Sequence, residues 1–250
     1  MTRTFGIWTV LLILGLVPSG DTDVVAGHSA GGSPIRLIQF GDPALGGEVL
    51  VFGCIHGDEC AARNVKPLIS GRPPTGVDIY SIPNLNPDGA ELGTRLNGRG
   101  VDLNRNFPAG WKPIGHRYDP EFSGPRPFSE PETRLAARII ERLRPEVTIW
   151  FHQERGLAEP YVRAWGPSAA AGRRFAHLEG MRFERLPWLA GTAPNWQNHA
   201  FPGTASFVVE LPQGSLPSSP ARYDATALGT AIVRLAREQL REENDPQRDG

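Results

Sequence analysis

Five short apolar runs, each bounded by glycine, proline or polar residues, constrain the fold of this chain more than any other sequence feature. They are IRLIQFG (35–41), EVLVFGC (48–54), VDIYSIP (77–83), VTIWFH (147–152) and ASFVVEL (205–211). Their length and their β-branched content predict strands of a buried sheet. Helical patterns lie between them, and strands that alternate with helices indicate an α/β architecture. We therefore expect a single α/β domain with a central, mixed, mostly parallel β-sheet flanked by helices on both faces.

Two helices are predicted with particular clarity. The first covers residues 130–143, where apolar side chains recur at helical spacing. We expect Ser129 to be its N-cap residue and Glu132 to complete a capping box. The last helix is predicted over about residues 221–241, before a charged tail.

The two ends of the chain differ in composition from the rest. Residues 1–20 combine Arg3, an apolar run and a Pro-Ser-Gly ending, a pattern typical of a secretory signal peptide. The alternative, a membrane anchor, is disfavoured because the run is too short to span a bilayer comfortably. We expect a flexible leader over residues 21–33, the main domain over 34–241 and a disordered tail over 242–250. These features predict a secreted or cell-envelope bacterial protein.

The overall charge limits the class of partner. The formal net charge is −1, and removal of Arg3 with a signal peptide would leave −2. No strong basic balance points toward nucleic acid or an anionic membrane. We expect a small-molecule or peptide substrate, no stable membrane insertion of the mature chain, and a monomer.

The segment GCIHGDEC (53–60) follows the second predicted strand and places His56 and Glu59 at the carboxyl edge of the sheet, where α/β proteins bind ligands. A plain polar turn before a helix is the alternative interpretation. His152 ends another predicted strand and supplies a third ligand, which is the usual number of protein ligands in a catalytic zinc site. Cys54 and Cys60 flank the segment, and the sequence leaves open whether they form a disulfide or stay as thiols.

Four further residues have side chains suited to peptide chemistry. Glu210 ends an apolar strand, where burying a carboxylate is costly, and it is the best candidate for a general base. Arg95, Asn104 and Arg105 lie in one long loop and offer donors that suit a carboxylate or a carbonyl oxygen. Each of the three, taken alone, would more often mark a turn or a solvated surface position.

Together these residues resemble the zinc metallocarboxypeptidase family, whose members show an H-x-x-E pair, a distant histidine, an Asn-Arg pair and a glutamate on a late strand. The resemblance covers about residues 35–240 and includes NPDG, GVDLNRNF and SEPET. It implies one zinc ion and the family's carboxypeptidase-like fold. It assigns the residues as follows: His56, Glu59 and His152 as zinc ligands, Asn104 and Arg105 as the carboxylate anchor, Arg95 as the carbonyl-polarising group, and Glu210 as the general acid/base.

The compact length resembles the bacterial murein peptide amidases, which cut the bond between γ-D-glutamate and diaminopimelate. We therefore predict a peptide or muropeptide substrate. Residues 186–209 contain no charged side chain, so this predicted pocket wall offers no partner for a basic substrate side chain. One departure concerns the tyrosine that family members often carry ahead of the glutamate strand, because no tyrosine lies between Tyr161 and Glu210. We expect that Trp188, Asn195 or Trp196 lines that loop instead, or that the donor is absent.

Three alternatives remain at this stage. A general zinc carboxypeptidase for apolar C-terminal residues would use the same ligands with a different pocket. A zinc deacylase of N-acyl amino acids shares parts of the pattern, although NPDG and SEPET fit peptidases better. A catalytically inactive peptide-binding module is disfavoured because the full set of metal and acid/base positions is present.

Overall fold

The computed structural model describes residues 22–41, 48–65, 74–214 and 225–243. Its strands are β1 (Thr22–His28), β2 (Pro34–Gly41), β3 (Val49–Phe52), β4 (Asp78–Ile82), β5 (Val147–Glu154), β6 (Tyr161–Ala164), β7 (Arg182–Arg185) and β8 (Ala205–Pro212). Its α-helices are α2 (Pro87–Leu92), α3 (Pro131–Leu143), α4 (Ala169–Glu179), α5 (Ala193–Ala200) and α6 (Ala225–Glu243). Short 3-10 helices are η1 (Ala61–Asn64), η2 (Leu103–Arg105) and η3 (Gly166–Ser168).

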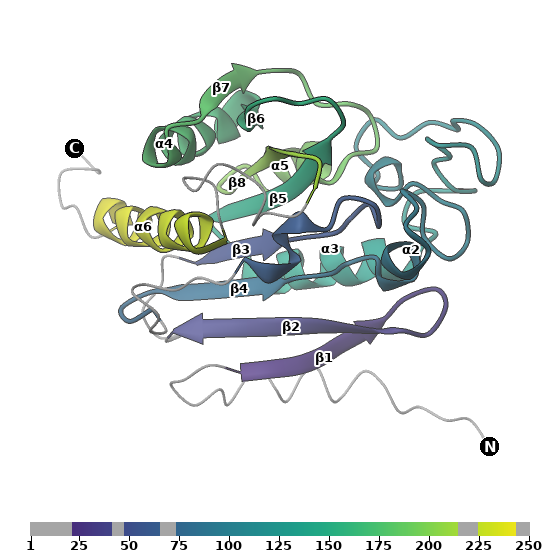
Figure 1. The fold of residues 1–250 in the computed structure, drawn as a ribbon, viewed down its shortest axis with the longest axis horizontal. Coiled ribbons are helices and arrows are strands. Elements are labelled where there is room, and N and C mark those ends of the chain that lie inside the picture. The colour runs from purple at the N-terminus through teal and green to yellow at the C-terminus, as the bar shows by residue number, and fades with distance from the viewer. Residues whose placement is uncertain (1–21, 42–47, 66–73, 215–224, 244–250) are drawn as a thin grey trace.

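The eight described strands form one sheet in the order β1-β2-β4-β3-β5-β8-β6-β7 (Figure 1). The four central strands β4, β3, β5 and β8 are parallel to one another. Antiparallel pairing joins β2 to β4 and β1 to β2 at one side, and β6 to β8 at the other. The mixed, mostly parallel sheet is confirmed, and the carboxyl ends of the central strands share one edge.

Alternating side chains of the central strands pack into two separate cores. Val49 and Val51 of β3 belong to the core covered by α4 and α6, whereas Leu50 and Phe52 belong to the core covered by α3 and α5. Trp150 of β5 stacks on Phe52, with the ring centroids 4.0 Å apart. Period-two alternation with apolar residues on both faces thus produces a sheet that is buried on both sides.

The structure differs from the sequence expectation at the start of the domain. Residues 22–28, expected in a flexible leader, form strand β1, which pairs with β2 at the sheet edge. The strand is half exposed and short of apolar residues, so its own composition does not reveal it. The turn from β1 into β2 is held by side chains of two helices. Ala30 N donates to the carboxylate of Glu132 in α3, and Gly31 N donates to the carboxylate of Asp88 in α2.

The predicted capping box of the 130–143 helix was wrong. Helix α3 begins one residue later, its N-cap position is Glu130, and that residue caps through no side-chain hydrogen bond. Glu132 instead points into the structure and accepts from Ala30 N at 2.8 Å. The segment that follows GCIHGDEC forms the 3-10 helix η1. The last helix covers Ala225–Glu243, so it extends two residues beyond the predicted end, and residues 221–224 of the predicted range lie outside the described part of the chain. Strands β6 and β7 and helices α2, α4 and α5 were not predicted.

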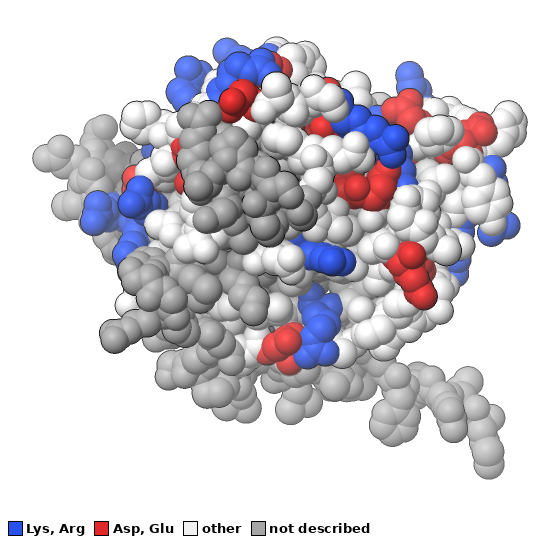
Figure 2. All heavy atoms as spheres, in the orientation of Figure 1, with Lys and Arg blue, Asp and Glu red and all other residues white. Residues whose placement is uncertain are grey.

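Positive and negative side chains are interspersed on the face seen in Figure 2, and neither sign forms a continuous patch among the described residues there. Within the described residues no helix is both long enough and apolar enough to span a bilayer. The predicted signal peptide (1–20) and residues 244–250 of the predicted tail lie outside the described part of the chain.

Candidate metal centre

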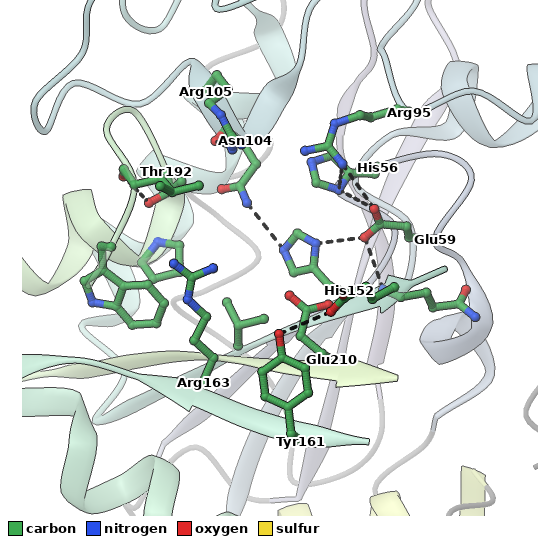
Figure 3. Close-up of a pocket in the computed structure, with 16 residues that line it drawn as sticks. His56, Glu59, Arg95, Asn104, Arg105, His152, Tyr161, Arg163, Thr192 and Glu210 are labelled. Atoms are coloured by element: carbon green, nitrogen blue, oxygen red, sulfur yellow. Dashed lines mark hydrogen bonds and ion pairs between the residues drawn. The ribbon is translucent and has the colours of Figure 1, made fainter. Parts of the chain in front are cut away.

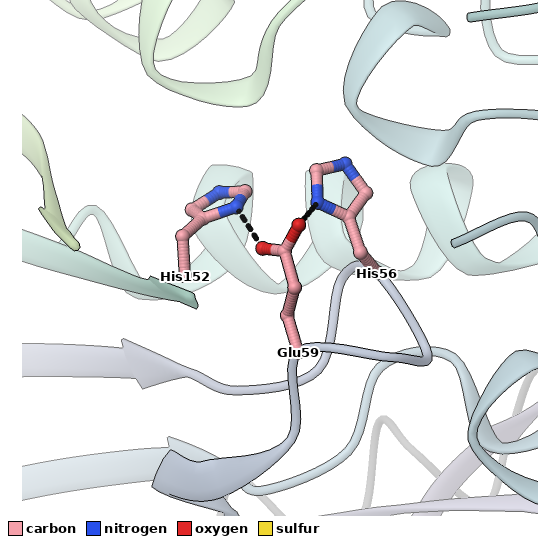
Figure 4. Close-up of side chains that lie close together, drawn as sticks. All are labelled: His56, Glu59 and His152. Carbon is pink, nitrogen blue, oxygen red and sulfur yellow. Dashed lines mark hydrogen bonds and ion pairs between the residues drawn. The ribbon is translucent and has the colours of Figure 1, made fainter. Parts of the chain in front are cut away.

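Three side chains meet at the carboxyl edge of the sheet, as their positions in the sequence predict. His56 and Glu59 lie in the loop after β3, and His152 lies near the end of β5, which is parallel and adjacent to β3. Both imidazole rings direct Nδ1 at the same carboxylate (Figure 4): His56 Nδ1 is 2.9 Å from Glu59 Oε1, and His152 Nδ1 is 2.8 Å from Glu59 Oε2. One ligand atom from each residue lies within 4.8 Å of the other two.

The loop that carries His56 and Glu59 is tightly fixed. Cys54 and Cys60 form a disulfide, which settles the pairing that the sequence left open. Glu59 N donates to His56 O at 3.1 Å and closes a turn inside the bridged segment. A side chain at Gly57 would overlap the backbone of Gly89 in α2, so only glycine allows the loop to pack this closely.

The donor set fits a zinc ion. Two imidazole nitrogens and one carboxylate form the N,N,O set that catalytic zinc sites use, with a further position left for water. Asp102 supports the set from outside, because its Oδ1 lies 3.2 Å from His56 Nε2 and its side chain is fully buried. A carboxylate on the far nitrogen of a ligand histidine fixes the orientation of the ring and raises its basicity.

The electrostatics of these groups favour a bound cation. Burial opposes ionisation of Glu59, but the two histidines outweigh it and lower the pKa of this carboxyl. The pKa of Asp102 is also lowered, against the effect of burial, by His56, Arg95 and Arg105. Burial alone would lower the pKa of His56, yet Glu59 and Asp102 raise it to about 9. Two carboxylates therefore stay ionised beside the ligand nitrogens.

Arg95 lies at the rim of this centre, in the loop that follows α2. Its Nε donates to Asp102 Oδ2 at 2.9 Å, and its Nη1 lies 3.2 Å from Glu59 Oε1. The side chain keeps 28% of its surface exposed. The guanidinium is thus held by two carboxylates while part of it faces the open cavity.

Glu210 lies directly beside the metal ligands. It is on β8, in register with His152 on β5. Burial raises the pKa of the Glu210 carboxyl, and the Glu59 and Glu154 carboxylates act in the same direction. A carboxylate with a raised pKa, close to a metal site, accepts a proton more readily than an ordinary carboxylate.

Asn104 and Arg105 come from η2 and face the same cavity. The Asp102 side chain caps η2 by accepting from Asn104 N at 2.9 Å. Asn104 Oδ1 accepts from Ala193 N at 3.0 Å, which ties η2 to the start of α5. Arg105 is 8% exposed, and its Nη2 lies 2.5 Å from the exposed carboxylate of Glu121.

All seven residues predicted for the site line one cavity of about 340 Å³ (Figure 3). Its other lining residues, by region, are Gln153 and Glu154 on β5, Tyr161 and Arg163 on β6, Trp188, Leu189, Thr192 and Pro194 from the 186–194 region, and Val208 on β8. Among the described residues, His56, Glu59 and His152 are the one group with metal-ligand geometry.

Three residues of this region were missed from the sequence. Asp102 stands in the quoted segment GVDLNRNF but received no role. Tyr161 and Arg163 belong to the unpredicted strand β6, whose apolar and aromatic run PYVRAW was the available signal. Tyr161 donates to Glu154 at 3.2 Å, and its burial, together with Glu210 and Glu154, raises the pKa of its hydroxyl to about 12.

Comparisons with known proteins agree with this geometry. Residues 75–173 match the zinc carboxypeptidase family. The chain is 35% identical to murein peptide amidase A of Escherichia coli (strain K12) over 146 residues, which are 50% of this chain and 57% of that protein. The matched region therefore spans little more than half the length of this curated relative.

Two solved structures share the fold. Carboxypeptidase A from Helicoverpa armigera aligns with a TM-score of 0.70 at 19% identity, over 91% of this chain and 70% of that one. The murein-tripeptide amidase of Escherichia coli O157 aligns with a TM-score of 0.64 at 24% identity, over 88% of this chain and 94% of that one. At these identities the alignments establish the architecture alone.

Proposed function

Because this chain belongs to the zinc carboxypeptidase family, we propose that it is an exported zinc-dependent peptidase that hydrolyses an amide bond next to a free carboxylate. We further propose that this bond joins γ-D-glutamate to diaminopimelate in cell-wall peptides. One observation carries the proposal: His56, Glu59 and His152 converge in the same cavity as Glu210 and Arg105.

The chemistry divides among a few groups. A zinc ion held by His56, Glu59 and His152 would lower the pKa of a bound water and polarise the substrate carbonyl. Glu210 accepts the proton of the attacking water and then donates it to the leaving amine. Its burial suits the first step, because a carboxylate with a raised pKa accepts a proton more readily.

Arg95 and Arg105 bind different parts of the substrate. Arg95, held by Asp102 at the rim, directs its exposed part toward the place where negative charge develops on the carbonyl oxygen. Arg105 and Asn104 anchor the free carboxylate of the substrate, for which Arg105 would exchange its exposed partner Glu121. Only the Glu121 side of this pair is exposed, and the substrate carboxylate would replace it with the same kind of charge-assisted hydrogen bond.

The choice of bond rests on similarity and on composition. The most informative relative is named a murein peptide amidase, and the predicted signal peptide would deliver the protein to the compartment that holds cell-wall peptides. The 186–209 segment adds no acidic side chain to the cavity, which disfavours substrates with basic C-terminal residues.

A general carboxypeptidase for apolar C-terminal residues is the second candidate. Leu189, Pro194 and Val208 line the same cavity and would accept an apolar side chain. The difference between the two candidates therefore lies in the released residue and not in the catalytic groups.

Product analysis by mass spectrometry separates the candidates. The zinc-loaded protein is incubated with L-alanyl-γ-D-glutamyl-diaminopimelate and with a panel of ordinary peptides, each with and without a chelator. We expect release of diaminopimelate that the chelator abolishes. Release of apolar C-terminal residues alone would favour the general carboxypeptidase, and no product from any substrate with zinc bound would indicate an inactive binding module.

A further inference from the structure

Strand β6 contributes a charged residue to the floor of the cavity. Along β6, Val162 and Ala164 point into the core beneath the sheet, while Tyr161 and Arg163 point to the other side and line the cavity. In the antiparallel pairing with β8, Tyr161 lies opposite Glu210 and Arg163 lies opposite Val208. Two residues of a strand span roughly 7 Å, so Arg163 sits about that far along the floor from the row that carries Glu210.

The guanidinium of Arg163 extends into the cavity (Figure 3). It is fixed on one side only: Nη2 donates to Pro187 O at 2.7 Å, and the group lies 5.5 Å from the centre of the Trp188 ring. The Nε atom is buried and has no hydrogen-bond partner. A buried donor without a partner is costly, and a guanidinium has five N–H donors to place.

The three arginines that line the cavity differ in whether a carboxylate of the protein forms an ion pair with them. Arg95 is paired with Asp102 and Glu59, and Arg105 is paired with Glu121. Over the residues that the structure describes, no ion pair with a carboxylate is found for Arg163. The indole Nε1 of Trp188, its neighbour, is likewise buried without a partner. An anion is thus the missing partner that would satisfy this end of the cavity.

The surroundings limit the shape of that anion. A carboxylate matches the planar fork of a guanidinium and can accept two hydrogen bonds at once. Val208 lies opposite Arg163 on the floor, two residues along β8 from Glu210, and Leu189 and Pro194 line the wall, so apolar surface is available for an aliphatic stem between the reacting bond and the charge. Since the proposed function already assigns the free main-chain carboxylate to Arg105, Arg163 is available for a second one.

We propose that Arg163, supported by Trp188, binds a carboxylate on the side chain of the residue that is released, and that it selects acidic or dicarboxylic residues over their neutral or basic counterparts. This inference rests on the proposed function for the position of the scissile bond. The 186–209 wall has no charged side chain, whereas the floor beneath it carries Arg163.

Two matched substrate pairs test the proposal. In the first, ordinary peptides end in glutamate or glutamine, which have the same shape and differ in charge. In the second, γ-D-glutamyl peptides end in diaminopimelate or lysine, which differ by the distal carboxylate. We expect wild-type protein to prefer the acidic member of whichever pair it cleaves by roughly 10- to 100-fold in kcat/KM, the size of one charge-assisted hydrogen bond.

Variants at Arg163 should change this ratio. Arg163→Gln should bring the acidic preference close to 1, and Arg163→Lys should restore part of it, because lysine keeps the charge but not the fork. The matched control is Arg185→Gln, an exposed arginine on β7 outside the cavity, which should keep the wild-type ratio. Zinc content and melting temperature establish that each variant is folded.

The outcomes separate this inference from the proposed function. An acidic preference that persists in Arg163→Gln, or a wild-type protein without any such preference, would overturn the role of Arg163. If diaminopimelate is released but Arg163→Gln keeps the wild-type preference for the acidic substrate, the proposed function stands and Arg163 does not bind the side-chain carboxylate. If only the glutamate and glutamine peptides are cleaved and their ratio collapses in the variant, the role of Arg163 stands and the proposed bond is wrong.

Discussion

Two clusters of buried carboxylates can be compared among the described residues. They differ in whether they border the cavity. The metal cluster, formed by His56, Glu59, Asp102 and His152, faces the cavity. The turn cluster, formed by Ser29, Asp88, Asn97, Glu130 and Glu132, lies where the β1–β2 turn meets α2 and α3. Both clusters include residues from the motifs GVDLNRNF, NPDG and SEPET. One cluster lies at the candidate metal centre, and the other holds the β1–β2 turn.

The turn cluster is closed on itself. Asp88 accepts from Ser29 Oγ at 2.6 Å and from Gly31 N at 2.7 Å. Asn97 Nδ2 lies 2.9 Å from Glu130 Oε2 and 3.3 Å from Glu132 Oε2. Every partner in these bonds is a group of the protein, so the cluster holds the edge hairpin to the helices.

The metal cluster has a different arrangement, because its ligand nitrogens and carboxylate oxygens converge on one point beside the cavity. In the metal cluster, the ligand atoms surround a position that an ion can occupy, so its carboxylate is a candidate functional group. In the turn cluster, the carboxylates bond to donors of the protein itself, so their role is structural. Changes in the first cluster should therefore affect zinc and turnover, and changes in the second should affect stability.

The largest expected effect is that of Glu210→Gln. The amide cannot accept the proton of the attacking water, so kcat should fall by roughly 10³-fold or more. Zinc content should stay at the wild-type value, because Glu210 is not a ligand. Steady-state kinetics with metal analysis checks both statements, and near wild-type turnover would remove Glu210 from the mechanism.

Arg105→Ala should act mainly on substrate binding. Loss of the carboxylate anchor should raise KM by roughly 10- to 100-fold with a smaller change in kcat. Glu121→Gln is the matched control, since it removes the partner of Arg105 while leaving the anchor in place, and it should not raise KM. An unchanged KM for Arg105→Ala on every carboxylate-bearing substrate would show that the anchor lies elsewhere.

Asp88→Ala should destabilise the fold and spare the metal centre. The variant leaves Ser29 and Gly31 without their acceptor, which should lower the free energy of unfolding by about 2–4 kcal/mol. Denaturant unfolding measures the loss, and Asp88→Asn, which keeps one acceptor, should lose less. Equal stability of Asp88→Ala and wild type would contradict the structural role given to the turn cluster.

The smallest effect concerns pH and Glu132. Burial raises the pKa of this carboxyl in the folded protein. A carboxyl whose pKa is higher in the folded than in the unfolded chain contributes stability at low pH, and this contribution is lost as pH rises through the folded-state pKa. The free energy of unfolding should decline over an interval that begins near the ordinary value of 4.5.

Glu132→Gln tests this, because a side chain that does not titrate should flatten the decline. Glu141→Gln, an exposed position on the same helix, is the control and should keep the wild-type slope. Stability that rises with pH over this interval in wild type but not in Glu132→Gln would reverse the sign of the argument.

Sequence patterns predicted the central strands and the three metal-ligating residues of the metal cluster because both depend on local signals. Each ligand stands at or just after the end of an apolar strand, and parallel strands bring such ends together. The sequence could not show which of the neighbouring polar residues line the cavity and which are buried in the fold. In the run Asn104-Arg105-Asn106, the first two line the cavity, whereas Asn106 is fully buried and donates to Ser123 O and Arg126 O.

The outer strands could not be predicted for a related reason. Strand β1 is held by pairing with β2 and by the turn cluster, and strand β6 has four residues, one of them charged. Their stability comes from tertiary contacts and not from their own composition. Arg163 was missed with β6, since only the antiparallel return of that strand places it on the cavity floor.

The most direct test of the account is the zinc content of His152→Ala compared with that of Asp88→Ala, measured on folded protein after dialysis against a weak chelator. The account predicts one zinc per chain in wild type and in Asp88→Ala, and none in His152→Ala. Zinc retained at full stoichiometry in His152→Ala, or lost in a folded Asp88→Ala protein, would contradict the division between the two clusters.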